Sequence, residues 1–204
     1  TGKARGRKRL EGLIGEAGDK DCFVFLDEAY IEFTGLESFC RMATECENLF
    51  VLRSLTKFFS LPGMRVGFGV GNEEMIDYLE RLRVPWNVNI LAQTAAIESM
   101  KDTEYQRRVR SFIEGERAFF YKGMRGLGLE THASEANFYL TDLTKNGVTA
   151  PELKGDLIKK NILIRDCSTF TGLDGRYMRT SVRTRDENLR LFEELRARLE
   201  LNKD

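Results

Sequence analysis

The chain has 204 residues, of which 42% are hydrophobic, and its 32 basic and 32 acidic side chains cancel to a formal net charge of zero. This length is enough for a sizeable core in one domain or two small ones. Zero net charge argues against nucleic acid or an anionic membrane as a main partner. No apolar run reaches the ~18 to 20 residues of a membrane span, and the start carries no signal peptide pattern.

The cysteines and the single histidine restrict the chemistry further. Cys22, Cys40, Cys46 and Cys167 contain no C-x-x-C pair, so we interpret them as reduced thiols in a cytoplasmic protein. With His132 as the only histidine, a metal site would depend on scattered cysteines and carboxylates. A Ser-His-Asp triad is equally disfavoured, because no nucleophile elbow accompanies that histidine.

The first part of the chain reads as a helix followed by strands. Residues 3–18 predict a helix that ends at Gly18-Asp19. Its apolar face would consist of Leu10, Leu13 and Ile14. The continuous apolar run 22–26 is typical of a strand covered on both faces in a parallel sheet. Two further strand-like runs lie at 49–52 and 66–70.

Capping residues mark the elements beyond residue 70. Asn72 precedes two glutamates, Pro151 suits a first helical turn, and Thr184 to Glu187 form a capping-box pattern. The expected elements are helices at 72–83, 90–100 and 102–125, a strand at 136–140, a helix at 151–160, strands at 162–164 and 177–182, and a helix at 184–199. We therefore predict an α/β domain over residues 1–103 and a small α+β domain over residues 104–204.

The segment that follows the second strand offers the most specific chemistry. Lys57 lies among hydroxyl residues, two phenylalanines and a Pro-Gly turn. Desolvation and a neighbouring cation both lower the pKa of a lysine, which makes it a competent Schiff-base nucleophile. The hydroxyls of Ser54 and Thr56, together with the Arg65 guanidinium, suit a phosphate. An aldehyde cofactor with a phosphate would use both features; the alternative is a solvated lysine in a strand-turn-strand.

This motif, Ser-x-Thr-Lys-Phe-x-x-Leu-Pro-Gly-x-Arg-x-Gly, resembles the cofactor-lysine motif of the fold type I aminotransferases. The resemblance implies pyridoxal 5'-phosphate bound at Lys57, and a mostly parallel sheet with helices on both faces. It also implies that Asp27, directly after the first strand, keeps the pyridine nitrogen protonated, while Tyr30 hydrogen-bonds the ring oxygen. Both residues have plain alternatives, a turn cap for Asp27 and a packed aromatic for Tyr30.

Four arginines near the C-terminal end form a second group. Arg179 and Arg183 would share a strand face, and Arg165 ends the preceding strand. Guanidinium groups are preferred partners of carboxylate and phosphate. Within the resembling family, Arg179 matches the arginine that binds the substrate carboxylate and Arg165 a second substrate arginine. For Arg176 and Arg183 the alternative is a solvated basic face balanced by the acidic helix that follows.

Three functions remain open at this stage. The stretch 164–179 and Arg183 resemble threonine-phosphate decarboxylases most, which implies loss of carbon dioxide from L-threonine O-3-phosphate in cobalamin biosynthesis. The alternative is a histidinol-phosphate aminotransferase, with Lys57 as the base that removes the α-proton. Either enzyme would take a small phosphorylated substrate and form a homodimer. A third possibility is an inactive fragment, because Thr1-Gly2 resembles the tail of a family turn and indicates the C-terminal portion of a longer enzyme.

Overall fold

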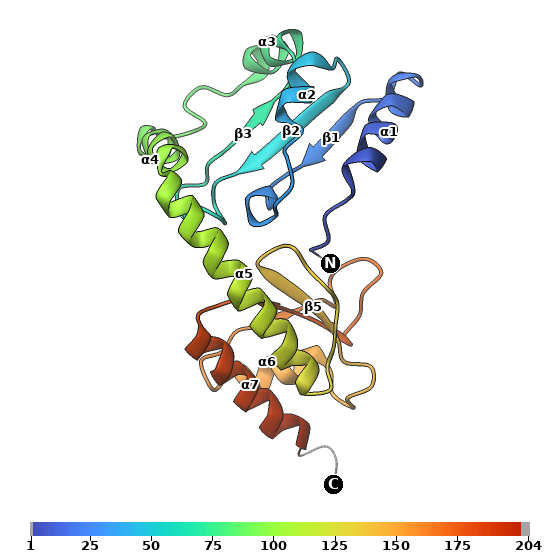
Figure 1. Cartoon of the computed structure of the whole chain (residues 1–204), viewed down its shortest axis with the longest axis vertical. Coiled ribbons are helices and arrows are strands. Elements are labelled where there is room, and N and C mark those ends of the chain that lie inside the picture. The colour runs from blue at the N-terminus through green and yellow to red at the C-terminus, as the bar shows by residue number, and fades with distance from the viewer. Residues whose placement is uncertain (1, 201–204) are drawn as a thin grey trace. The chain divides into compact units, whose positions relative to one another are not determined.

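The computed structural model describes residues 2–200 (Figure 1). The chain divides into two compact units, one formed by Arg5–Arg110 and the other by Ser111 onward together with the start of the chain up to Ala4. This division lies within the long helix, as does the sequence-based domain boundary at 103/104, which is seven residues earlier. That domain boundary stays a prediction, and each unit is described below by itself.

The first unit contains a three-stranded sheet in the order β1-β2-β3 (Figure 1). Strand β2 pairs in parallel with β1 and antiparallel with β3. The elements are α1 (Arg7–Gly18), β1 (Val24–Asp27), the 3-10 turn η1 (Ile31–Phe33), α2 (Cys40–Glu45), β2 (Leu49–Ser54), β3 (Gly67–Val70), α3 (Glu73–Leu82), α4 (Ile90–Lys101) and the first part of α5 (Thr103–Gly126). The α/β class is therefore confirmed.

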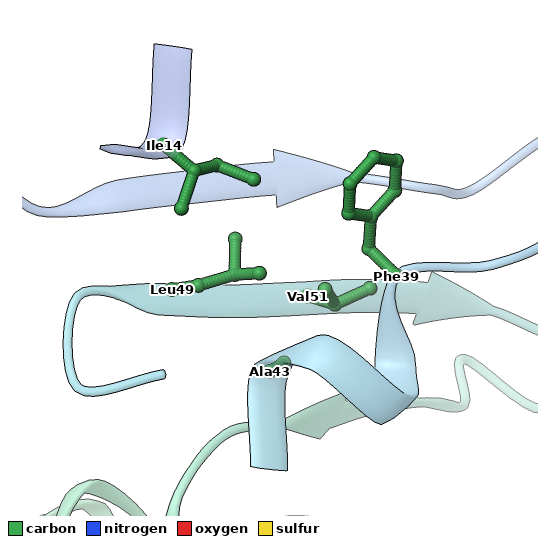
Figure 2. Packing of buried hydrophobic residues seen from close by; sticks show 5 residues of the cluster. All are labelled: Ile14, Phe39, Ala43, Leu49 and Val51. Atoms are coloured by element: carbon green, nitrogen blue, oxygen red, sulfur yellow. The ribbon is translucent and has the colours of Figure 1, made fainter. Parts of the chain in front are cut away.

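Helices α1 and α2 cover the same face of this sheet. Side chains from both helices gather with alternate residues of β2 in a buried cluster (Figure 2). The cluster consists of Ile14, Phe39, Ala43, Leu49 and Val51. Because side chains alternate along a strand, the odd-numbered residues of β2 face these helices and the even-numbered residues face the other way. This alternation decides which residues of β2 can meet a ligand.

The opposite face of the sheet is open in the part of the chain that the structure describes, so the described residues do not supply the cover expected on it. Phe25 is 65% exposed and Leu52 is 43% exposed, because helices α1 and α2 pack on the other side. Phe50 is buried on this open face only because its ring lies over Gly69, where a Cβ would come within 2.2 Å of it. Cys22, expected in a buried strand, is also exposed.

The second unit is built around a four-stranded antiparallel sheet in the order β4-β5-β7-β6. Its elements are the remainder of α5, β4 (Glu130–Thr131), β5 (Phe138–Asp142), α6 (Ala150–Ile158), β6 (Arg165–Asp166), β7 (Tyr177–Ser181) and α7 (Arg185–Glu200). Phe120 of α5 is fully buried, stacks on Tyr139 at 5.5 Å between ring centroids and also contacts Phe192 of α7. This helix-on-sheet packing is the expected α+β arrangement.

Capping interactions confirm three predicted helix starts. The Asn72 side chain accepts a hydrogen bond from the Met75 amide at 2.9 Å at the start of α3. Thr149 forms a complete capping box with Glu152 at α6, where Pro151 occupies the first turn. At α7, the Thr184 hydroxyl donates to Glu187 at 2.7 Å. These signals were readable because each acts within three residues.

Several predicted details are wrong. The strand expected at 162–164, ending in Arg165-Asp166, is confirmed only at that end, as β6; before it, Asn161 takes a positive φ of 56° and Leu163 is 75% exposed. Leu13 of α1 is exposed rather than part of the apolar face of that helix. The patterns also missed η1, α2 and β4, which are too short for a periodic signal.

Candidate functional site

The first part of the candidate site lies on the turn that leaves β1. Asp27 is the last residue of β1, in register with Leu52 of β2, and it is exposed on the open face. Its Oδ1 accepts a hydrogen bond from the Ala29 amide at 2.8 Å, which closes an Asx turn. Tyr30 follows on the same turn and is half-buried. Both predicted ring-binding residues therefore lie at the carboxyl end of a strand, where open α/β sheets bind ligands.

The second part lies just beyond the adjacent carboxyl end of β2. The Lys57 amine donates to the Ser54 hydroxyl at 3.3 Å, and the hydroxyls of Ser54 and Thr56 are 2.8 Å apart. The Lys57 nitrogen lies 5.1 Å from the centre of the Tyr30 ring. The structure thus brings the amine, two hydroxyls and a phenol ring together from two separate turns.

Lys57 is exposed, so the predicted apolar surroundings are wrong for the described residues. The neighbouring Phe58 and Phe59 are buried instead in the core of the unit. There they pack with Tyr105 of α5, whose hydroxyl donates to the Phe58 carbonyl at 3.1 Å. The phenylalanines therefore hold the loop in place and do not enclose the amine.

Arg65 does not join the hydroxyl cluster in this structure. Its guanidinium is exposed and donates to the Pro62 carbonyl at 3.1 Å. Arg65 and Ser60 both have positive φ values, 53° and 54°, which is uncommon for non-glycine residues. Such strained backbone often occurs in ligand-binding loops. The role of Arg65 as a phosphate ligand stays a prediction.

The donor set suits the cofactor that the sequence motif implies. Among residues 2–200, no carboxylate pairs with Lys57 and no cation pairs with Asp27. A free amine can bond an aldehyde, and a free carboxylate can hold a protonated ring nitrogen. The hydroxyls of Ser54 and Thr56 can donate to phosphate oxygens. The residues present therefore fit pyridoxal phosphate.

The two predicted substrate arginines are neighbours in the second unit. Strand pairing places Arg165 of β6 directly opposite Arg179 of β7. Both guanidinium groups lie over the Phe170 ring, at 5.4 and 6.0 Å from its centre, and Arg179 also lies over Phe138. Neither arginine forms an ion pair within the described part of the chain. Because like charges directly opposite are destabilising, this pair is suited to an anion. The role of Phe170 had no recognisable signal in the sequence.

The other two arginines are paired with carboxylates. Arg176 makes a bidentate contact with Asp174, with its Nε 2.9 Å and its Nη2 2.5 Å from Oδ2. Arg183 lies beyond the end of β7, so it does not share a strand face with Arg179, and it pairs with Glu187 at 2.7 Å. Arg176 and Arg183 are thus better described as surface arginines balanced by carboxylates than as ligands of a substrate anion.

The Arg183–Glu187 pair predicts a pH dependence of stability. Hydrogen bonds from Arg183 and then from Thr184 lower the pKa of Glu187 from 4.5 to about 2. The contribution is present above pH 4.5 and is lost as the pH falls through about 2. Because the pair is exposed, we expect it to be worth at most about 1 kcal/mol.

The measurement is the unfolding midpoint from pH 7 to pH 2 for the wild type and Glu187→Gln. The wild-type advantage at neutral pH should shrink towards the acid end. A stability difference that stays constant over this range would contradict the lowered pKa of Glu187.

Other kinds of site find little support in the part of the chain that the structure describes. All four cysteines are free thiols. Within residues 2–200, no group of three or more His, Cys, Asp or Glu side chains could hold a metal ion. None of the helices described is both long and apolar enough to cross a membrane.

Comparison with known proteins agrees with this geometry. Residues 1–195 match the family model described as aminotransferase class I and II. A histidinol-phosphate aminotransferase from Methanothermobacter thermautotrophicus is 36% identical over 176 residues, which are 86% of this chain and 47% of that protein. A protein from Caldanaerobacter subterraneus, provisionally named threonine-phosphate decarboxylase, is 36% identical over 203 residues, 97% of this chain and 54% of that protein.

A solved structure resembles the whole fold. The histidinol-phosphate aminotransferase from Clostridium acetobutylicum superposes with a TM-score of 0.91 at 30% identity, covering 98% of this chain and 61% of that one. The chain spans about half the length of the curated relatives that it matches. On the family model and on these relatives, the chain belongs to the class I and II aminotransferase family.

Proposed function

We propose that the complete polypeptide is a pyridoxal-phosphate-dependent enzyme whose cofactor is bound at Lys57. The observation that carries the proposal is the contact of the Lys57 amine with the Ser54 hydroxyl and the Tyr30 ring, at the sheet edge where Asp27 ends β1. Bound pyridoxal phosphate supplies an electron-withdrawing ring. The chain supplies the groups that hold and orient that ring.

Each residue of the site has a distinct role in this proposal. The Asp27 carboxylate would hold a proton on the pyridine nitrogen, and Tyr30 would donate to the ring oxygen. The hydroxyls of Ser54 and Thr56, with Arg65, would bind the phosphate. The Lys57 amine would bond the aldehyde and, once displaced by substrate, act as the base at the α-carbon.

We propose transamination of histidinol phosphate with 2-oxoglutarate as the first candidate reaction. Further curated relatives that are 31–36% identical carry the same name, histidinol-phosphate aminotransferase. The Arg165–Arg179 pair supports a substrate that brings an anion, since two adjacent guanidinium groups suit a phosphate or a carboxylate. These arginines would hold the substrate anions in both half-reactions.

Decarboxylation of L-threonine O-3-phosphate, in cobalamin biosynthesis, is the second candidate. The relative named as a decarboxylase matches nearly the full chain at an identity equal to that of the aminotransferase relative. Arg183 supports this reaction less than its position in the sequence indicated, because its guanidinium is paired with Glu187. The second reaction would use the same lysine and ring, with the carboxylate bond oriented for cleavage.

A homodimer is part of the proposal. The loop before α4 and the first turn of α4 carry strongly exposed apolar side chains. Trp86 is 97% exposed, and Ile90 and Leu91 are each about 70% exposed. Exposed apolar patches of this kind favour protein–protein contacts. A second copy of the chain would be the expected partner at this patch.

The test measures two reactions in parallel with the complete polypeptide as it is made in the cell. We expect amino transfer from histidinol phosphate to 2-oxoglutarate, and no carbon dioxide release from L-threonine O-3-phosphate without a keto acid. Arg179→Gln should raise the KM for the phosphorylated substrate about tenfold or more, since one charge-assisted contact is lost. The matched control Arg176→Gln should leave it unchanged.

Two other results would favour the decarboxylase or the inactive fragment over the aminotransferase. Carbon dioxide release without a keto acid would establish the decarboxylase instead. A polypeptide that binds no pyridoxal phosphate at all would favour the inactive fragment.

A further inference from the structure

A buried charged network lies behind the candidate site, on the covered face of the sheet. Arg53 immediately precedes Ser54 on β2, and Glu28 is the first residue after Asp27, where β1 ends. The side chains of Arg53, Glu28 and Glu32 are only 17%, 4% and 5% exposed. Glu28 and Arg53 are thus buried next in the chain to two of the proposed ligand-binding groups, and Glu32 is buried in contact with Arg53.

The contacts of this network join four segments of the unit. Arg53 Nη2 donates to Glu32 Oε1 of η1 at 2.7 Å, and its Nη1 lies 3.7 Å from Glu28 Oε2. Arg53 Nη1 also donates to the Ser38 hydroxyl at 3.1 Å. Glu28 in turn accepts from the Ser38 hydroxyl at 2.5 Å and from the Phe39 amide at 2.8 Å. The ends of β1 and β2 are therefore tied to η1 and to the loop before α2.

Stability alone does not account for this network. Burying a charge is costly, and an apolar cluster of the same volume often stabilises a protein as much as a buried ion pair does. Within residues 2–200, the buried atoms Glu32 Oε2 and Arg53 Nε have no hydrogen-bond partner. Burial lowers the pKa of Arg53, but the hydrogen bond and charge of Glu32 outweigh this and leave the pKa raised. Arg53 therefore stays charged inside the unit.

Because of strand geometry, contacts that fix Arg53 also fix the position of the next residue, Ser54. Neighbouring residues on a strand point to opposite faces, so fixing Arg53 on the covered face also fixes the direction of Ser54 on the open face. In the same way, the contacts of Glu28 fix the direction of Asp27, the residue before it at the end of β1. A backbone hydrogen bond from the Glu28 amide to the Leu52 carbonyl, at 2.9 Å, joins the two strand ends directly.

We propose that Arg53, Glu28 and Glu32 form a positioning network that sets the separation between the Asp27 carboxylate and the cluster of Ser54 and Lys57. The inference rests on the proposed function, because it assigns these residues to the cofactor site. None of the three touches the reacting atoms. Their effect is to hold the ring-nitrogen partner and the aldehyde partner at one fixed distance.

The test uses Glu32→Gln and Arg53→Gln in the complete polypeptide loaded with pyridoxal phosphate. Both variants should raise the Kd for pyridoxal phosphate and lower kcat up to about 100-fold, the cost of misplacing reacting groups by about an ångström, with KM little changed. The pH midpoint of the bound cofactor's visible absorbance should also shift. The matched control is Arg41→Gln, because the exposed Arg41 side chain contacts the exposed Glu45 at 3.9 Å; it should change none of these quantities.

A double variant, Arg53→Gln with Glu32→Gln, tests whether the network acts as a unit. Its effect on Kd should be clearly smaller than the product of the two single effects, since the two residues contact each other. If Arg53→Gln does not fold, Glu32→Gln decides the question, because glutamine keeps the shape of the side chain. Fully multiplicative effects would argue against a shared network and overturn the inference.

Two further outcomes distinguish this inference from the proposed function. If the wild type binds no pyridoxal phosphate, the proposed function fails and the inference fails with it. If the wild type binds it, and Glu32→Gln lowers only the melting temperature while Kd, kcat and absorbance stay within twofold, the network is structural. The positioning role is then overturned and the proposed function stands.

Discussion

Replacing Lys57 with alanine is expected to abolish the visible absorbance of bound pyridoxal phosphate and to lower kcat about 10³-fold or more. The amine is both the group that bonds the cofactor aldehyde and the proposed base, so one change removes two functions. The fold should survive, because Lys57 is exposed and its hydrogen bond to Ser54, at 3.3 Å, is long. We expect the free energy of unfolding to change by less than about 0.5 kcal/mol.

The measurement combines absorbance, the mass of the protein after borohydride reduction, and the melting temperature of the cofactor-free form. Lys101→Ala is the matched control, since this lysine of α4 lies on the surface in contact with Glu98. The control should keep the absorbance and the cofactor mass. A Lys57→Ala protein that retained a normal covalent cofactor would refute the assignment of this lysine.

Replacing Asp27 with asparagine is expected to lower kcat about 100-fold or more and to weaken cofactor binding. The charge that would hold the ring-nitrogen proton is lost, and preorganised charges of this kind carry large shares of catalysis. Asparagine keeps an oxygen that can accept the 2.8 Å hydrogen bond from the Ala29 amide, so the turn after β1 is preserved. Asp27→Ala should be worse than Asp27→Asn, because it also removes that turn contact.

Activity with saturating pyridoxal phosphate, and the Kd from titration, separate the two effects. Asp77→Asn is the control, because Asp77 is an exposed residue of α3. Normal turnover in Asp27→Asn would remove the electron-sink role from this carboxylate. It would leave the assignment of Lys57 untouched, since the two residues come from different strand ends.

The network around Arg53 shows what patterns along a chain do not report. Arg53 stands one residue before a motif that was readable, yet nothing in the sequence paired it with Glu28 and Glu32. These partners are 25 and 21 residues away and meet only because β1 and β2 pair in parallel. Short-range rules describe contacts between residues three or four positions apart. The contacts of Arg53 instead depend on the register in which β1 and β2 pair.

The arginine group illustrates the same limit in the second unit. Spacing placed Arg179 and Arg183 on one face, but the strand ends at Ser181. The true neighbour of Arg179 is Arg165, brought opposite to it by antiparallel pairing of β6 and β7. The residue type alone indicated anion binding. Which arginine lies next to Arg179 could be learned only from the pairing of the strands in the sheet.

The amino-acid sequence by itself determined the motif around Lys57, the placing of Asp27 and Tyr30 after a strand, the helix caps and the family. These depend on residue identity and on contacts a few residues apart, which the linear order preserves. Only the tertiary structure decided that one sheet face is open, that Lys57 is exposed, and that Arg183 pairs with Glu187. Burial and charge pairing are set by which distant segments pack together, and that follows from strand register rather than from spacing.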